Sequence, residues 1–245
     1  MKIESQHTVG EIAAKDPRAL DLFERTGIDY CCRGAMRLDE ACRQAGANLA
    51  DILAALHAIE PSGPAAASFT DWRTEPIANL LGHIEREHHT YTRSALQTCG
   101  QLARKVLAAH GERHTELREI VAVFDALADE LDGHLLKEER VLFPYIAALD
   151  VADASGGRAP FAPFGSVQNP VRMMSFEHDS AGDALKELRS HTRGYTLPDD
   201  ACASYRAFYE ALHALERDLH VHIHLESNVL FPRAIALEAR LARRT

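Results

Sequence analysis

The motif His-x-x-x-Glu occurs twice in the second half of the chain, each time among the same apolar residues. The first copy is His134 and Glu138, and the second, His222 and Glu226, follows at a spacing of 88 residues. Four residues advance an α-helix by about 400°, so in each copy the imidazole and the carboxylate project from nearly the same face, one turn apart. The apolar positions repeat as well: Leu127, Leu131, Val141 and Leu142 in the first copy, and Leu215, Leu219, Val229 and Leu230 in the second. Both motifs are therefore predicted to point into a helical core.

A buried carboxylate beside a buried imidazole is costly unless a cation offsets the loss of hydration. Histidine and glutamate are both good ligands for first-row metals, so we interpret the duplicated motif as a metal site. The alternative is a buried His–Glu hydrogen bond without metal. That arrangement is common as a single instance, and two copies in the same frame disfavour it.

Two further helical segments carry histidines near their apolar faces. His178 shares its arc with Met174 and Leu185, and His83 lies at the edge of an arc that contains Leu80. We expect both histidines to be ligands. The same helical projection places Glu177 beside the site, where it suits an outer contact or an access channel, and makes Glu87 an additional candidate ligand. It predicts that His88 and His89 turn outward. It places His220 and His224 on the solvent face.

Four imidazoles and two carboxylates exceed what one metal ion can use while it still binds a ligand. Two ions could each take two histidines, with Glu138 and Glu226 bridging them. An oxo or hydroxo bridge would bring the charge nearer to neutrality. Ligation rich in imidazole and free of thiolate suits iron better than a cysteine-based zinc site, although the sequence leaves manganese and zinc open.

Helical periodicity dominates the chain, and almost no stretch alternates with period two. Thr8 with Glu11 fits a capping box, and Gly27 fits a helix C-cap. The pattern predicts an all-α fold in which a small helical domain, 1–60, and a linker, 61–70, precede a four-helix bundle, 71–245. The expected helices are 49–59 in the first domain and 75–109, 116–148, 171–192 and 199–242 in the bundle, with a loop over 150–170.

Composition excludes several classes of protein. The 245 residues include 14 histidines and carry a net charge of −9, which argues against binding to a nucleic-acid backbone. No apolar run approaches the ~20 residues of a membrane span, and the N-terminus lacks the apolar segment of a secretory signal. The five cysteines form no Cys-x-x-Cys pair, and Cys42, Cys99 and Cys202 are expected to serve packing. We therefore expect a cytoplasmic protein that binds neither membrane nor nucleic acid.

The inferred site resembles the di-iron centre of hemerythrin-like bundles. The N-terminal segment narrows the resemblance to the repair-of-iron-centres family, di-iron proteins linked to the repair of iron–sulfur clusters after nitrosative and oxidative stress. The matching motifs are Asp29-Tyr30-Cys31-Cys32-Arg33-Gly34, Leu81-Gly82-His83-Ile84, His134-Leu135-Leu136-Lys137-Glu138-Glu139, Phe176-Glu177-His178-Asp179 and His222-Ile223-His224-Leu225-Glu226. Together they cover nearly the whole chain.

The resemblance implies terminal ligands at His83, His134, His178 and His222, bridging carboxylates at Glu138 and Glu226, and two iron ions. It also matches His110, near a helix end, to a family position. Cys31 and Cys32 are either small buried packing residues or a thiol pair that contacts iron, a damaged cluster or a partner cysteine.

The function that follows is repair of damaged iron–sulfur proteins, by supply of iron rather than by enzymatic turnover. The alternative is a cytosolic protein that binds and sequesters nitric oxide. Nitric oxide or oxygen is the expected small ligand, and the sequence leaves a homodimer open.

Overall fold

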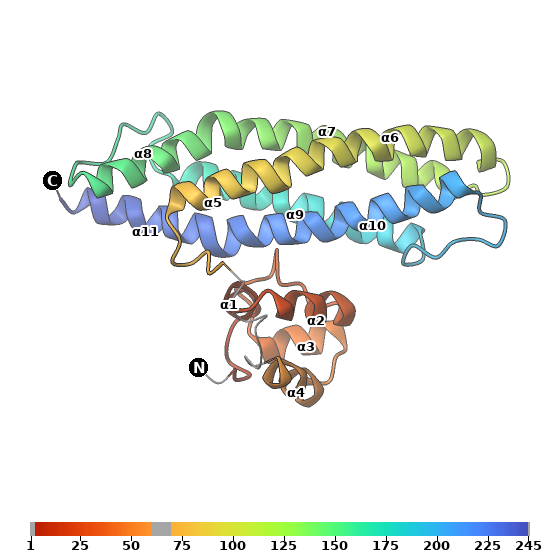
Figure 1. Ribbon diagram of the computed structural model, residues 1–245, viewed down its shortest axis with the longest axis horizontal. Helices are drawn as coiled ribbons and strands as arrows, with labels where there is room; N and C mark the ends of the chain where they lie inside the picture. Colours follow the sequence, from red (N-terminus) through yellow and green to blue (C-terminus); the bar gives the residue numbers. More distant parts are fainter. Residues whose placement is uncertain (1–2, 60–69, 245) are drawn as a thin grey trace. The chain divides into compact units, whose positions relative to one another are not determined.

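The computed structural model describes residues 3–59 and 70–244, and within these ranges the protein contains helices and no strand (Figure 1). The all-α prediction is confirmed. The predicted linker 61–70 lies outside the described residues except for Thr70. The N-terminal helices are α1 (Val9–Lys15), α2 (Arg18–Thr26), α3 (Leu38–Ala45) and α4 (Leu49–Ala58).

The rest of the described chain forms four long helical runs, three of them interrupted by a short π-helix (η). The runs are α5 (Ile77–His83), η2 (Ile84–His89) and α6 (Thr90–His110); α7 (Leu117–Lys137), η3 (Glu138–Leu142) and α8 (Phe143–Ala154); α9 (Gln168–His191); and α10 (Ala203–His224), η4 (Leu225–Leu230) and α11 (Phe231–Ala242). No helix among the described residues is long and apolar enough to cross a membrane.

Local sequence signals set the ends of several helices. At the start of α1, Glu11 N–H donates to Thr8 Oγ1 (3.3 Å) and Thr8 N–H donates to Glu11 Oε2 (3.0 Å), which confirms the capping box. Gly27 ends α2 with a φ of 69°, as predicted. The expected loop 150–170 is wrong at both ends, because α8 continues to Ala154 and α9 begins at Gln168. Pro170 is compatible with α9 because the first turn of a helix needs no N–H donor.

The described chain divides into two compact units. One consists of Gly82–Ala148 and Pro160–Leu219, and the other of the described residues within Met1–Leu81, Leu149–Ala159 and His220–Thr245. In the first unit, α6, α7, α9 and α10 bury one continuous apolar core that includes Cys99, Phe124, Leu185 and Phe208. The helices of this unit lie within the predicted bundle range 71–245, and the predicted domain bounds stay a prediction.

The second unit is built around the N-terminal helices. Its core includes Val9, Phe23, Tyr30 and Leu38, and Ile223 from the end of α10 belongs to the same cluster. The helical segment that carries the second His-x-x-x-Glu motif therefore packs against the segment that carries the two neighbouring cysteines.

Asn228, in η4, fixes this contact with hydrogen bonds. Its Nδ2 donates to the carbonyl of Tyr30 (3.0 Å) and lies 3.3 Å from the carbonyl of Cys31. Two glycines leave room for the side chain: a Cβ on Gly34 would lie 1.9 Å from Asn228 Oδ1, and a Cβ on Gly10 would lie 2.8 Å from it. The backbone of α1 is also joined to the segment that follows Cys32, since Gly10 N–H donates to the carbonyl of Gly34 (2.8 Å).

We predict that Gly34→Ala lowers the free energy of unfolding by about 1–3 kcal/mol, because the added methyl group collides with an Asn228 side chain held by two carbonyls. Urea unfolding followed by circular dichroism measures the change. The control is Gly133→Ala in α7, where no neighbouring atom lies within 4 Å of the new Cβ and the better helix former is expected to stabilise. Equal effects of the two substitutions would contradict the proposed close fit.

Candidate metal centre

Glu138 is a fully buried carboxylate that faces imidazoles from two helical runs. Its Oε2 lies 3.4 Å from His89 Nε2, at the end of η2, and 3.4 Å from His134 Nε2, at the end of α7. The side chains of His89 and Glu138 are completely buried, and that of His134 is 4 % exposed. Because an isolated carboxylate is expensive to bury, positive charge must be supplied here by protonated imidazole or by a metal ion.

His178, from α9, adds a second imidazole to His134. The two Nε2 atoms lie 3.2 Å apart, and both residues are 3 % exposed. One ligand atom from each of His134, Glu138 and His178 lies within 4.8 Å of the others. Two ring nitrogens that face each other compete for one proton, whereas a metal ion accepts an electron pair from both. The buried His/Glu cluster therefore fits a metal site.

The other ring nitrogen of His89 is anchored outside the cluster. His89 Nδ1 lies 2.8 Å from Glu139 Oε1, and the Arg93 guanidinium donates to both Glu139 oxygens at 2.8 and 2.9 Å. Burial by itself would raise the pKa of Glu139, but the hydrogen bonds from Arg93 and His89 hold that pKa below its ordinary value. The ionised carboxylate keeps the proton of His89 on Nδ1 and leaves Nε2 available as a ligand.

His134 is oriented in the same way by a different carboxylate. His134 Nδ1 lies 2.9 Å from Glu177 Oε2, and Lys137 forms an ion pair with the other Glu177 oxygen. Burial opposes ionisation of Glu177, but the contacts with Lys137 and His134 keep its pKa below the ordinary value. Glu177 thus holds His134 by the outer nitrogen of its ring. Contacts of this kind to a metal-binding histidine typically change metal affinity 10- to 100-fold.

In the second copy of the motif, the imidazole and the carboxylate contact each other directly. His222 Nε2 lies 3.0 Å from Glu226 Oε1, and the two side chains are 1 % and 0 % exposed. His222 is in the last turn of α10 and Glu226 is in η4, so the carboxylate of this copy, like Glu138 in η3, lies within a π-helical turn. π-helical turns inside α-helices occur frequently at functional sites.

Along α5, η2 and α6, the helix face on which some side chains lie differs from the face predicted from the sequence. His88 and His89 are buried, at 6 % and 0 % exposure, so the expectation that they turn outward is wrong. The π-helical turn η2 inserts an additional residue, and each inserted residue rotates the later side chains by about 100° relative to an uninterrupted α-helix.

His83 lies half-buried at the end of α5, with its ring centroid 5.4 Å from that of His88. Burial lowers the pKa of His83. His83 does not belong to the cluster around Glu138. That His83 binds a metal ion therefore stays a prediction. Glu87 is exposed.

The expectation that His220 and His224 occupy the solvent face is also wrong. His224 is 2 % exposed, and burial lowers its pKa to about 4, although a hydrogen bond with the Tyr30 backbone favours the charged form. Its ring packs edge-on against Tyr30, with centroids 5.6 Å apart. His220 Nδ1 lies 2.7 Å from Glu24 Oε1, which also accepts a hydrogen bond from the Tyr30 hydroxyl (2.9 Å). These histidines bind the N-terminal helices.

Cys31 is buried and Cys32 is half-buried, and their sulfur atoms lie 3.7 Å apart as free thiols. Asp29 Oδ1 accepts from the backbone N–H of Cys32 (3.0 Å) and lies 3.4 Å from Cys31 Sγ. The contact with Cys32, burial and the nearby Asp29 carboxylate raise the pKa of the Cys31 thiol well above its ordinary value. Cys31 is therefore a protonated thiol in this structure, with one carboxylate and a second thiol beside it.

Four further residues that the sequence singles out lie outside the cluster. Cys42 and Cys99 are buried, in agreement with a packing role, but Cys202 is exposed, so that expectation is wrong for Cys202. His110 is buried at the end of α6, where its Nε2 lies 3.2 Å from Cys202 Sγ.

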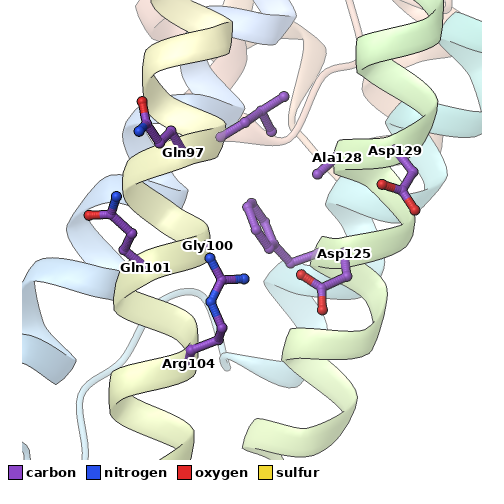
Figure 2. A pocket seen from close by; sticks show the side chains of 9 residues that line it. Gln97, Gly100, Gln101, Arg104, Asp125, Ala128 and Asp129 are labelled. Atoms are coloured by element: carbon purple, nitrogen blue, oxygen red, sulfur yellow. The ribbon is translucent and has the colours of Figure 1, made fainter.

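An open groove of about 560 Å³ lies on the bundle surface between α6 and α7. Figure 2 shows Gln97, Gln101 and Arg104 on one side and Asp125 and Asp129 on the other. None of the predicted metal-binding residues lines this groove. Its mixture of positive and negative side chains indicates no particular class of bound molecule.

Comparison with known proteins identifies the family of the chain. Residues 80–234 match the hemerythrin HHE cation-binding domain, and residues 5–60 match a domain of unknown function, DUF542. The chain therefore belongs to the hemerythrin HHE family, whose domain binds a metal that is typically iron.

Two relatives extend the match over both domains. The chain is 35 % identical over 231 residues to a probable iron–sulfur cluster repair protein of Haemophilus influenzae, covering 94 % of this chain and 97 % of the relative. It is 34 % identical over 228 residues to the iron–sulfur cluster repair protein YtfE of Yersinia pestis, covering 93 % and 96 %. The chain thus belongs to the family of these repair proteins, and the family predicted from the sequence is confirmed.

We predict that Glu139→Gln and Glu177→Gln each lower iron affinity about 10- to 100-fold while helicity is retained, because a neutral amide no longer fixes the proton on Nδ1 of the ligand histidine. Competition with a chromophoric chelator measures the affinity. Glu87→Gln is the matched control, since Glu87 is exposed. An unchanged affinity in both variants would show that these carboxylates do not orient the ligands.

Proposed function

We propose that the protein binds two iron ions through both copies of the His-x-x-x-Glu motif. Both copies belong to buried groups of His and Glu side chains that could hold a metal ion. Glu138 and Glu226 serve as bridging carboxylates in this proposal, and His89 takes the ligand role on the first long run. The proposed ligand set is His89, His134, Glu138, His178, His222 and Glu226.

Iron in such a centre supplies redox chemistry and binding of small ligands such as nitric oxide or oxygen. The residues of the chain supply orientation and exclusion of water. Glu139 and Glu177 hold the imidazoles of His89 and His134 by their outer nitrogens, and burial of Glu138 favours a positively charged occupant. This donor set contains no thiolate, which favours iron over a structural zinc ion.

We predict two iron ions per chain in anaerobically purified protein, measured by metal analysis. Glu138→Ala and Glu226→Ala are expected to reduce the stoichiometry to one or fewer, because each removes a shared carboxylate. His89→Ala is expected to lose iron and His83→Ala to retain it, since His89 Nε2, and not His83, belongs to the cluster around Glu138.

The matched control for these variants is His220→Ala, which removes an imidazole from the neighbouring face without touching the cluster. A single metal per wild-type chain would contradict the two-iron centre. Loss of iron from His83→Ala with retention in His89→Ala would instead support His83 as the ligand on this run.

We propose further that the protein repairs iron–sulfur clusters damaged by nitrosative or oxidative stress by supplying iron, in the cytoplasm. The observation that carries this proposal is the match over both domains to proteins named for iron–sulfur cluster repair. Damaged iron–sulfur proteins are then the partners, and iron is the cargo. Repair requires that at least one ion leave the centre, and a shift of one bridging carboxylate would loosen both ions together.

Cys31 and Cys32 fit a docking role better than a nucleophilic one in this structure. Burial and the neighbouring groups keep the Cys31 thiol protonated, and the thiolate is the form that attacks and ligates. The pair lies on the loop whose Tyr30 and Cys31 carbonyls bind Asn228. A partner that displaces this loop would change the exposure of both thiols.

We predict that reduced, iron-loaded wild-type protein restores the activity of an iron–sulfur enzyme inactivated by nitric oxide, and that Glu138→Ala does not. A Cys31→Ser, Cys32→Ser double variant that keeps its iron but fails to restore activity would place the thiols in the transfer step. Equal recovery with this variant would confine them to packing.

The competing function is binding of nitric oxide without transfer of iron. Tight binding of nitric oxide, seen as a change in the absorption spectrum, with no recovery by any variant would exclude the repair proposal and favour sequestration. The iron-loaded protein should be compared with an equal concentration of free ferrous iron, so that recovery is assigned to the protein.

A further inference from the structure

Cys202 is an exposed thiol that contacts a buried histidine at the far end of α6. Its Sγ lies 3.2 Å from Nε2 of His110, the last residue of α6, although the two residues are 92 positions apart in the chain. The 21 residues of α6 span about 30 Å of helix and separate this contact from His89, which directly precedes α6. The proposed iron centre therefore does not account for the pairing of Cys202 with His110.

The Cys202 thiol is the only hydrogen-bond partner of the His110 ring among the described residues. His110 is 7 % exposed, and its Nδ1 has no partner in this part of the chain. The fully buried Tyr205 packs edge-on against the imidazole, with ring centroids 5.3 Å apart. Burial deprives the imidazole of hydration, so its one polar contact carries weight. His110 is thus held with Nε2 directed at Cys202 Sγ.

Cys202 also occupies the N-cap position of a long helix. The helix α10 begins at the next residue, Ala203, and Arg206 N–H donates to the Cys202 carbonyl (3.0 Å). The N-terminus of an α-helix carries partial positive charge. A thiolate is stabilised by a helix N-terminus and by a neighbouring imidazolium, and cysteines in such surroundings are typically reactive. Both influences act on Cys202.

The charged groups around the pair favour a protonated His110. His114 Nε2 lies 2.8 Å from Asp200 Oδ1, and His114 Nδ1 lies 3.2 Å from Glu116 Oε1. The hydrogen bond from His114 holds the pKa of Asp200 below its ordinary value, and Arg113 lies 3.4 Å from Asp200 Oδ2. A ring nitrogen of His110 lies within 4.8 Å of an Asp200 oxygen, so an ionised carboxylate lies close enough to stabilise an imidazolium.

The other four cysteines lie in different surroundings. Cys31, Cys42 and Cys99 are buried, and Cys32 is half-buried. Burial raises the pKa of Cys99 to about 12 and also raises the pKa of Cys42. The contact with Cys32, together with burial, raises the pKa of Cys31. Because the thiolate is the nucleophile, Cys31, Cys42 and Cys99 are expected to be inert at neutral pH.

We propose that Cys202 is a nucleophilic thiol, activated by His110, that forms mixed disulfides with low-molecular-weight disulfides such as oxidised glutathione. His110 Nε2 takes the proton of the Cys202 thiol, and the thiolate attacks one sulfur of the small disulfide. A bond forms between Cys202 Sγ and that sulfur, and the original S–S bond breaks. The other half leaves as a thiolate and takes up the proton from His110. The small disulfide is the oxidant, so the site acts independently of bound iron.

The rate of thiol–disulfide exchange tests this site. The reduced full-length protein is mixed with dithiobisnitrobenzoate, and the released chromophore is followed by absorbance. Peptide mass spectrometry after one equivalent, and after treatment with oxidised glutathione, identifies the modified cysteine. We expect Cys202 to react first. At about pH 6 it should react about tenfold or more faster than free glutathione, because a thiol with the ordinary pKa of about 8.5 is almost entirely protonated there.

Matched variants assign the reaction to Cys202 and His110. We expect Cys202→Ser to abolish the fast reaction. His110→Phe keeps an aromatic ring against Tyr205 but removes the base, and should slow the reaction about tenfold at about pH 6, with unchanged helicity by circular dichroism. The difference from wild type should shrink at about pH 9, where a thiol ionises without help.

Two controls keep the chemistry of Cys202 intact. The Cys31→Ser, Cys32→Ser double variant should react at the wild-type rate. His191→Phe should do so too, since His191, at the end of α9, pairs with Glu119 and Glu187.

Three results would overturn the proposal: first reaction at another cysteine, a wild-type rate no faster than that of glutathione at about pH 6, or an undiminished rate in His110→Phe. The second of these needs no variant. Metal-free and iron-loaded protein should react equally fast, so failure of the proposed iron centre would leave this test unchanged.

Discussion

Burial of the Glu138 carboxylate among imidazoles is the constraint on which the rest of the bundle depends. An ionised carboxylate with no exposed surface is tolerated only where positive charge and hydrogen bonds compensate for its lost hydration. His89 and His134 approach it from two helical runs, and His178 approaches His134 from a third. The helices must therefore keep these side chains in place against the strong preference of each for water.

Charged pairs at the rim of the cluster provide much of this control. Glu139 with Arg93 and Glu177 with Lys137 each connect an outer ring nitrogen of a buried histidine to a partly exposed ion pair. The cations keep the carboxylates ionised, the carboxylates fix the imidazole protons, and the inner nitrogens are left for a metal. Preorganisation of this kind reduces the rearrangement that metal binding would otherwise require.

The N-terminal helices are bound to the same helical segment that carries the second motif copy. Ile223 joins their apolar core, His224 packs on Tyr30, and Asn228 bonds the backbone of the loop that carries Cys31. On one segment, His222 and Glu226 form a buried pair while Ile223, His224 and Asn228 hold the loop with the thiols. The buried His222–Glu226 pair and the residues that hold the cysteine loop thus lie within about two turns of one helical segment.

The sequence alone determined the all-α fold, the family, and a core position for His134, Glu138, His178, His222 and Glu226, because these inferences depend only on helical periodicity and on motif spacing. It could not locate His89, since a π-helical turn changes the rotation per residue and leaves no mark in a projection at 100° per residue. Nor could it show that His224 is buried and that the half-buried Asn228 binds the Tyr30 carbonyl, because the face opposite His222 and Glu226 looks polar until another segment covers it. The partners of Glu139 and Glu177, and the meeting of His110 with Cys202 across 92 residues, were decided only by tertiary structure, because they join helices whose mutual register no local pattern encodes.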